Sequence, residues 1–60
     1  MRFSDFWERL QDQLGDAYAD SFARDQVIED LGLTIYQAFE RGIETHQVWR
    51  AVAEREGWPQ

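Results

Sequence analysis

Four glycines divide the chain into short segments, and each segment carries apolar residues at the spacing of an α-helix. Gly15, Gly32, Gly42 and Gly57 stand where those segments end, and glycine readily closes a helix because it tolerates a positive φ. No segment shows the apolar and polar alternation of a half-buried strand. The sequence therefore predicts an all-α chain without strands, folded as a compact orthogonal array of three to four short helices.

The first two helices are predicted from their apolar stripes and candidate caps. The first follows a cap at Ser4, ends at Gly15 and has an apolar face formed by Phe3, Phe6, Trp7, Leu10 and Leu14. The second follows a cap at Asp16 and runs to Leu31, because apolar residues continue at helical spacing to that point. Its stripe is wide, so this helix is expected to touch more than one neighbour.

Residues 34–54 have the spacing of a helix-turn-helix corner. Thr34, followed three residues later by a glutamine, matches a capping box at the start of a short helix. Counted from Thr34, Ala38 is the fifth residue, Gly42 the ninth and Val48 the fifteenth, which fits a small crossing residue, a turn and an apolar contact. Any tight helical corner needs the same residue types. The pattern therefore predicts a packed corner more strongly than a unit that reads DNA.

The outer face of the last helix is the candidate DNA-contacting surface. This helix is predicted to begin at a cap formed by Glu44 or Thr45 and to stop at Gly57. Three side chains on its outer face have the chemistry to contact base edges, namely Thr45, Gln47 and Arg50. Acidic residues flank them in the sequence, and these would repel phosphates.

The charge of the chain argues against nucleic acid. Six arginines, no lysine and twelve acids give a net charge of −6. Nucleic-acid binding normally needs a basic patch, because phosphate neutralisation supplies most of the non-specific affinity. The simplest interpretation is a solvated acidic surface. An alternative is an acidic nucleic-acid mimic that docks on a basic partner through Asp16, Asp20, Glu29 and Asp30.

Composition sets limits on chemistry and location. A chain of 60 residues predicts one domain spanning residues 1–60, and the absence of cysteine excludes disulfides and thiolate metal sites. His46 is the only histidine, and its place near a helix start is typical of an exposed side chain. We therefore expect no enzyme activity, cofactor or metal. Charged residues interrupt the N-terminal segment, which predicts a cytoplasmic chain without a membrane span.

Nine aromatic residues are more than a core of this size can enclose. Some aromatic faces are therefore expected at the surface, where Trp, Tyr and Arg commonly anchor protein interfaces. Tyr36 and Trp58 are the candidates for such contacts. The alternative for Trp58 is that it folds back over the core.

Three stretches resemble a known family over nearly the whole chain. MRFSDFWERL, YADSFARDQVIEDLG and AFERGIETHQVWRAV resemble, in this order, small actinobacterial proteins classed as a domain of unknown function. The resemblance implies a cytoplasmic, all-helical protein. It also implies a link to DNA repair, because family members are encoded near the recombinase RecA and its regulator RecX. Gln26 stands where many members carry histidine, so no histidine chemistry is expected at that position.

These observations favour a small helical domain that binds another protein, with an expected link to DNA repair or recombination regulation. The alternatives are a DNA-binding helix-turn-helix protein and the acidic mimic. The partner's identity and the oligomeric state stay open at this stage.

Overall fold

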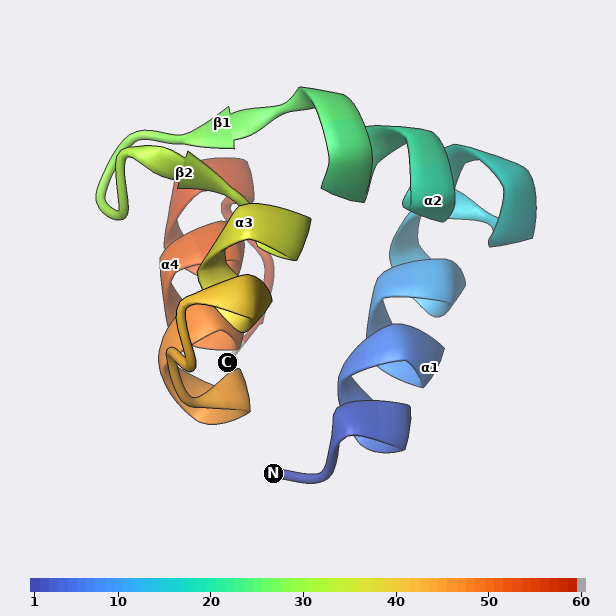
Figure 1. Cartoon of the computed structure of the whole chain (residues 1–60). Coiled ribbons are helices and arrows are strands. Elements are labelled where there is room, and N and C mark those ends of the chain that lie inside the picture. The colour runs from blue at the N-terminus through green and yellow to red at the C-terminus, as the bar shows by residue number, and fades with distance from the viewer. Residues whose placement is uncertain (60) are drawn as a thin grey trace.

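The computed structural model describes residues 1–59 and shows four helices and one small hairpin (Figure 1). The elements are α1 (Phe3–Leu14), α2 (Asp16–Asp25), β1 (Val27–Ile28), β2 (Leu33–Thr34), α3 (Ile35–Glu40) and α4 (Thr45–Glu56). The extents of 24 × 22 × 21 Å describe a compact body rather than an elongated bundle. The prediction of a compact, mainly helical fold is confirmed.

The hairpin corrects two predictions, because α2 does not run to Leu31 and the chain does contain strands. The helix ends at Asp25, and β1 then pairs antiparallel with β2, joined by a turn in which Gly32 takes a φ of 67°. Val27 is 50% exposed, whereas Ile28 is fully buried. A strand alternates its faces in this way, and both residues are β-branched, which favours extended backbone. Ile28 thus reaches the core from a strand.

The caps predicted at Ser4 and Asp16 are wrong. Arg2 occupies the N-cap position of α1 and Gly15 that of α2, and neither start has a side-chain capping bond. Ser4 lies inside the first turn of α1. Asp16 is already helical because Gly15 alone forms the link between the two helices, with a φ of 86°. A one-residue link leaves no extended position for a capping side chain.

The start of α3 confirms the predicted capping box. The Gln37 amide donates to Thr34 Oγ1 at 3.2 Å, and the Thr34 amide donates to Gln37 Oε1 at 3.0 Å. At α4, Glu44 is the N-cap of the two candidates, and Gly57 closes the helix in the left-handed conformation with a φ of 74°.

The corner between α3 and α4 packs as its spacing predicts. Ala38 and Val48 are fully buried, and Gly42 adopts a φ of 78° in the turn. The Ile43 amide donates to the Ala38 carbonyl at 3.0 Å, which holds the turn against the end of α3. The residues that match a helix-turn-helix are therefore those that build the corner.

The core lies between the helices and is centred on Phe6. Its ring meets those of Trp7, Phe39 and Trp49 edge to face, at centroid distances of 5.7, 5.1 and 5.7 Å. The other large side chains that are fully buried are Leu10, Ile28, Ile35, Val48 and Val52. Across residues 1–59, no helix combines the length and the apolar character that crossing a bilayer requires.

Candidate functional site

An aromatic surface lies where side chains of α1 meet side chains of α3. We call it the aromatic strip, and it consists of Phe3, Trp7, Tyr36 and Phe39. The Phe3 ring lies 5.9 Å from Trp7 and 5.0 Å from Phe39, and the Trp7 ring lies 5.5 Å from Tyr36. Phe3 is 54% exposed, and the other three side chains are partly buried. These contacts fix the rings while leaving apolar area open to water.

Tyr36 ends the strip with a polar link to α2. Its hydroxyl donates to Asp20 Oδ1 at 2.5 Å, and Arg24 Nη2 donates to Asp20 Oδ2 at 2.8 Å. The hydrogen bond to Asp20, together with burial and the charge of that carboxylate, raises the pKa of Tyr36 above its ordinary value. The ring of Tyr36 therefore stays in the strip while its hydroxyl is engaged within the fold.

The link between Tyr36 and Asp20 predicts a pH-dependent stability. Because the folded pKa of Tyr36 is raised, its contribution is complete below the unfolded pKa of about 10 and is lost as pH rises through the folded value. Tyr36→Phe should lower the free energy of unfolding by about 1 kcal/mol at neutral pH. The difference from wild type should vanish in strong alkali.

Urea unfolding across this pH range measures that difference. Tyr18→Phe is the matched control, because it removes the same hydroxyl from a side chain that is 53% exposed. A Tyr36→Phe loss that stayed constant into strong alkali would contradict the assigned hydrogen bond.

Trp58, the second candidate contact, lies over the core rather than in the strip. Its ring stacks on Trp49 at a centroid distance of 5.8 Å and lies 6.5 Å from Phe22. Beneath it, Trp49 is only 5% exposed, and its buried indole Nε1 has no hydrogen-bond partner among residues 1–59. Trp58 therefore folds back over the core, as the alternative interpretation predicted.

The three candidate DNA contacts on α4 do not form one open surface. Gln47 and Arg50 are exposed and line a surface hollow together with Glu44 and His46. Thr45 is partly buried, and its hydroxyl donates to the Met1 carbonyl at 2.6 Å. The start of the chain thus lies against the start of α4. The Glu44 carboxylate beside Gln47 and Arg50 would repel phosphates, and the Thr45 hydroxyl is already hydrogen-bonded within the fold. The surface proposed to read DNA is therefore reduced to Gln47 and Arg50.

The four candidate docking acids are separated. Asp16 begins α2, whereas Glu29 and Asp30 lie in the hairpin turn, beyond the opposite end of that helix (Figure 1). Asp20 is paired with Arg24, and Glu29 accepts a hydrogen bond from Arg55 at 3.3 Å. Two of the four charges are therefore partly compensated. The set does not form the continuous acidic face that a nucleic-acid mimic would present.

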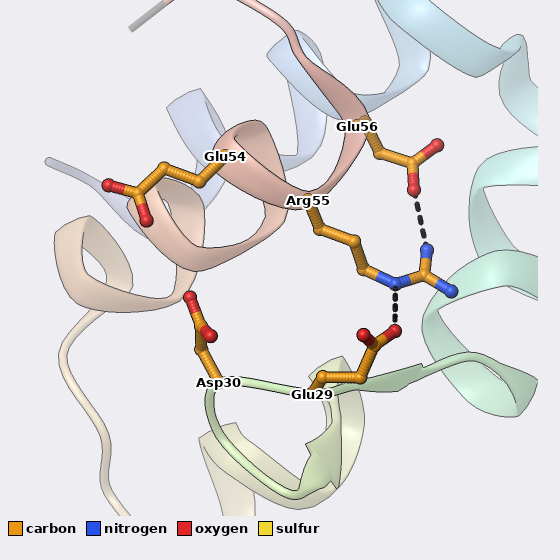
Figure 2. A pocket seen from close by; sticks show the side chains of 5 residues that line it. All are labelled: Glu29, Asp30, Glu54, Arg55 and Glu56. Carbon is orange, nitrogen blue, oxygen red and sulfur yellow. Dashed lines mark hydrogen bonds and ion pairs between the residues drawn. The ribbon is translucent and has the colours of Figure 1, made fainter.

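A hollow near the end of α4 is lined by charge. Figure 2 shows Arg55 reaching between two carboxylates, while the carboxylate of Glu54 points away from it. The lining residues are Glu29, Asp30, Glu54, Arg55 and Glu56. A hollow with this lining lacks the mainly apolar wall of a typical small-molecule site.

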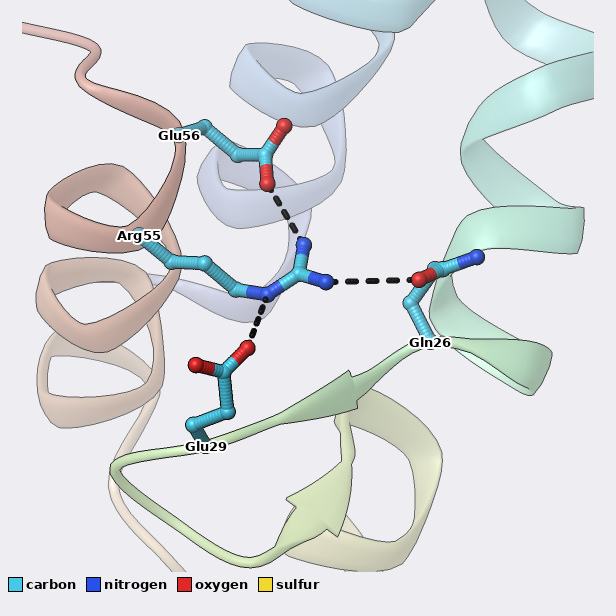
Figure 3. A network of polar contacts seen from close by, with 4 residues as sticks. All are labelled: Gln26, Glu29, Arg55 and Glu56. Carbon is cyan, nitrogen blue, oxygen red and sulfur yellow. Dashed lines mark hydrogen bonds and ion pairs between the residues drawn. The ribbon is translucent and has the colours of Figure 1, made fainter.

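Arg55 ties the end of α4 to the segment that follows α2 (Figure 3). Its Nε donates to Glu29 Oε1 at 3.3 Å, its Nη2 to Gln26 Oε1 at 3.3 Å and its Nη1 to Glu56 Oε2 at 2.5 Å. The guanidinium carbon also lies 5.8 Å from the centroid of the Phe22 ring. All three nitrogens of the guanidinium are engaged internally, so this hollow does not present a cation to an anionic ligand.

Sequence reasoning missed the Arg55 network. Arg55 lies 26 residues from Glu29 and 29 from Gln26, so no local spacing marks these contacts. Gln26 lies between α2 and β1, and its neighbours in the sequence do not mark it as a partner of Arg55. The structure gives that amide oxygen a hydrogen bond from Arg55.

Replacing Arg55 should loosen this end of the fold. Arg55→Met keeps the apolar stem but loses the three polar contacts and the cation–π contact, which we expect to cost about 1–2 kcal/mol in unfolding free energy. The matched control is Arg50→Met, an exposed arginine of the same helix. Because salt screens these charges, the Arg55→Met loss should shrink in 1 M NaCl, by roughly half. Equal losses in both variants would contradict a specific clamp.

The part of the chain that the structure describes contains no cluster of side chains suited to hold a metal ion. No three His, Asp or Glu side chains of residues 1–59 converge as a metal site requires. His46 is exposed at the start of α4. The expectation that the chain is not an enzyme stays a prediction.

The sequence as a whole matches a family model, described as "Protein of unknown function (DUF3046)", over residues 1–60. The chain belongs to the DUF3046 family. No curated protein and no solved structure matches it. The resemblance to a family of unknown function is thus confirmed, whereas its actinobacterial and genomic associations stay predictions. Both the aromatic strip and the Arg55 network of this DUF3046 chain lie within the matched region.

Proposed function

We propose that this chain is a protein-binding domain and that the aromatic strip is its contact surface. The observation that carries the proposal is Phe3, which is 54% exposed and yet fixed by ring contacts with Trp7 and Phe39. Ordered aromatic side chains at a surface are the usual anchors of protein interfaces, because they bury much apolar area at little entropic cost. Exposing these apolar rings to water is unfavourable, and a protein partner that covers them would remove that cost.

The hollows support a protein partner rather than a small molecule. They are lined mainly by charged and amide side chains: one by Glu29, Asp30, Glu54, Arg55 and Glu56, another by Asp5, Glu8, Arg9 and Asp12, and a third by Glu44, His46, Gln47 and Arg50. Small-molecule sites are mostly concave and apolar. We propose that the partner is a cytoplasmic protein that acts in DNA repair or recombination, the process that the family resemblance implies.

Site-specific photo-crosslinking in the cells that express the chain tests this proposal. A photoreactive phenylalanine analogue at Phe3 should give discrete protein adducts. The same analogue at Asp12 is the control, because nine residues turn an α-helix by about two and a half turns and place Asp12 on the opposite side of α1. Adducts that form equally from both positions, or from neither, would overturn the proposal.

DNA reading through α4 is the alternative, and we expect it to fail in a direct assay. With a net charge of −6 and no lysine, the chain should not shift any DNA fragment in a mobility assay at low salt. A retarded band that disappears in Arg50→Ala would instead establish α4 as a reading helix.

A further inference from the structure

Residues 57–59 follow α4 and lie over one side of the core, and we call them the strap. Gly57 turns the chain out of the helix with a φ of 74°, in the left-handed region. The amides of Gly57 and Trp58 both donate to the Ala53 carbonyl, the second at 2.9 Å. Pro59 has no amide hydrogen to donate. Within residues 1–59, the strap is therefore held by this one carbonyl and by the packing of the Trp58 ring.

The Trp58 ring covers aromatic side chains of α2 and α4. It stacks on Trp49 of α4 with 29° between the ring planes, and its centroid lies 6.5 Å from that of Phe22 on α2. Trp58 is itself only partly buried, whereas Trp49 and Phe22 are almost fully buried. The exposed ring of Tyr18 lies 6.2 Å from Phe22. Moving Trp58 away would therefore uncover two aromatic rings beside one that is already open to water.

The contact beneath the strap leaves one polar group unsatisfied. Trp49 Nε1 is buried and has no hydrogen-bond partner among residues 1–59. The ring of Trp58 cannot supply one, because an indole donates a hydrogen bond but accepts none. A buried donor without a partner costs free energy, and that cost is relieved when water or another acceptor reaches the Trp49 indole. The closed strap thus combines favourable ring contact with an unfavourable buried donor, which lowers the free energy needed to open it.

We propose that the strap is a lid that opens while the four helices stay folded, and that Trp58 then vacates a binding site for an aromatic side chain of a partner protein. Trp58 itself identifies this occupant, because an aromatic ring of the same chain already stacks on Trp49 and lies beside Phe22. A partner residue also brings backbone carbonyls, which can accept a hydrogen bond from the Trp49 indole. The closed contact is therefore autoinhibitory. The site lies on α2 and α4, apart from the residues of the aromatic strip, so the outcome at one surface does not decide the outcome at the other.

Hydrogen exchange of the full chain, followed by NMR, tests whether the lid opens. We expect the Trp49 indole proton to have a protection factor at least about tenfold below that of the Val52 amide, because local opening needs less free energy than global unfolding. Val52 is the reference because it is fully buried in the same helix. Low concentrations of urea should accelerate exchange at Val52 and leave Trp49 unchanged, since a local opening exposes little surface. Equal protection and equal urea dependence of the two protons would overturn the lid.

Trp58→Gly tests the site itself, with N-acetyltryptophanamide as the probe. The probe should shift the Trp49 indole signal of this variant and bind wild type at least about tenfold more weakly, because the closed strap reduces the fraction of competent molecules. Phe3→Ser, which removes an exposed ring elsewhere, is the control and should bind the probe as weakly as wild type. N-acetylleucinamide, which lacks the ring, should shift neither chain.

The remaining outcomes of this experiment all count against the proposal. No shift in Trp58→Gly, or an equal shift with N-acetylleucinamide, would overturn the aromatic site. Circular dichroism verifies that Trp58→Gly is folded. An unfolded variant would overturn the lid as well, because a segment that opens while the helices stay folded cannot be essential to their folding.

Discussion

Phe6→Ala should leave the chain largely unfolded in water. Phe6 has no exposed surface, and its ring meets three other aromatic rings at the centre of the core. Truncation of a buried phenylalanine costs about 3–5 kcal/mol through lost burial and the cavity left behind. A chain of 60 residues has a total stability of about 3–9 kcal/mol. The expected loss is therefore comparable to the whole stability.

Phe3→Ala is the matched control for this experiment. It removes the same atoms from the same helix, but Phe3 is 54% exposed, so the cost should stay below about 1 kcal/mol. Far-UV circular dichroism and urea titration of the two variants measure the contrast. Similar losses would show that the placement of α1 is wrong, because the two rings would then share one environment.

Ala38→Leu should be the second most damaging of these substitutions. Ala38 is fully buried where α3 crosses α4. Val48 of α4 is also fully buried, and Gly42 forms the turn between the two helices with a positive φ. Extra methylene groups at a packed crossing force the helices apart, which costs about 3 kcal/mol. Leucine itself is a good helix former, so the loss reports packing rather than helix propensity.

Ala17→Leu supplies the comparison for the corner. Ala17 is exposed on α2, and leucine there should change the unfolding free energy by less than about 0.5 kcal/mol. Thermal melts of both variants separate the two sites. If Ala38→Leu were as stable as wild type, the corner would be loosely packed, and the helix-turn-helix spacing would carry no structural meaning.

The predictions from sequence were reliable where a local rule has no competitor. The capping box at Thr34, the crossing at Ala38 and the closing Gly57 each follow from residues within one or two turns. The error in α2 arose where two rules compete. Val27 and Ile28 continue the helical stripe, yet a two-residue apolar run also fits a strand, and periodicity cannot separate the two.

The candidate site was predictable only in part. Tyr36 was expected at the surface, and it lies in the aromatic strip. Phe3 was placed on the apolar face of the first helix, because its spacing from Phe6 and Trp7 is helical, and it was not named as a candidate contact. Phe3 is 54% exposed although its ring contacts Phe39 of α3, and no spacing within α1 reveals how much of the ring that contact covers. The Arg55 network was also not predicted, because Glu29 and Gln26 are distant from Arg55 in the sequence.

The three tryptophans occupy three different surroundings, and this gives the chain intrinsic fluorescent reporters. Trp7 is partly exposed in the aromatic strip, Trp49 is 5% exposed in the core, and Trp58 stacks on Trp49 near the C-terminus. A ligand on the strip would change emission from Trp7, whereas unfolding would shift that of Trp49 to longer wavelength. Binding through Trp7 and unfolding through Trp49 can thus be followed without a label in two separate variants, each with the other two tryptophans replaced by phenylalanine.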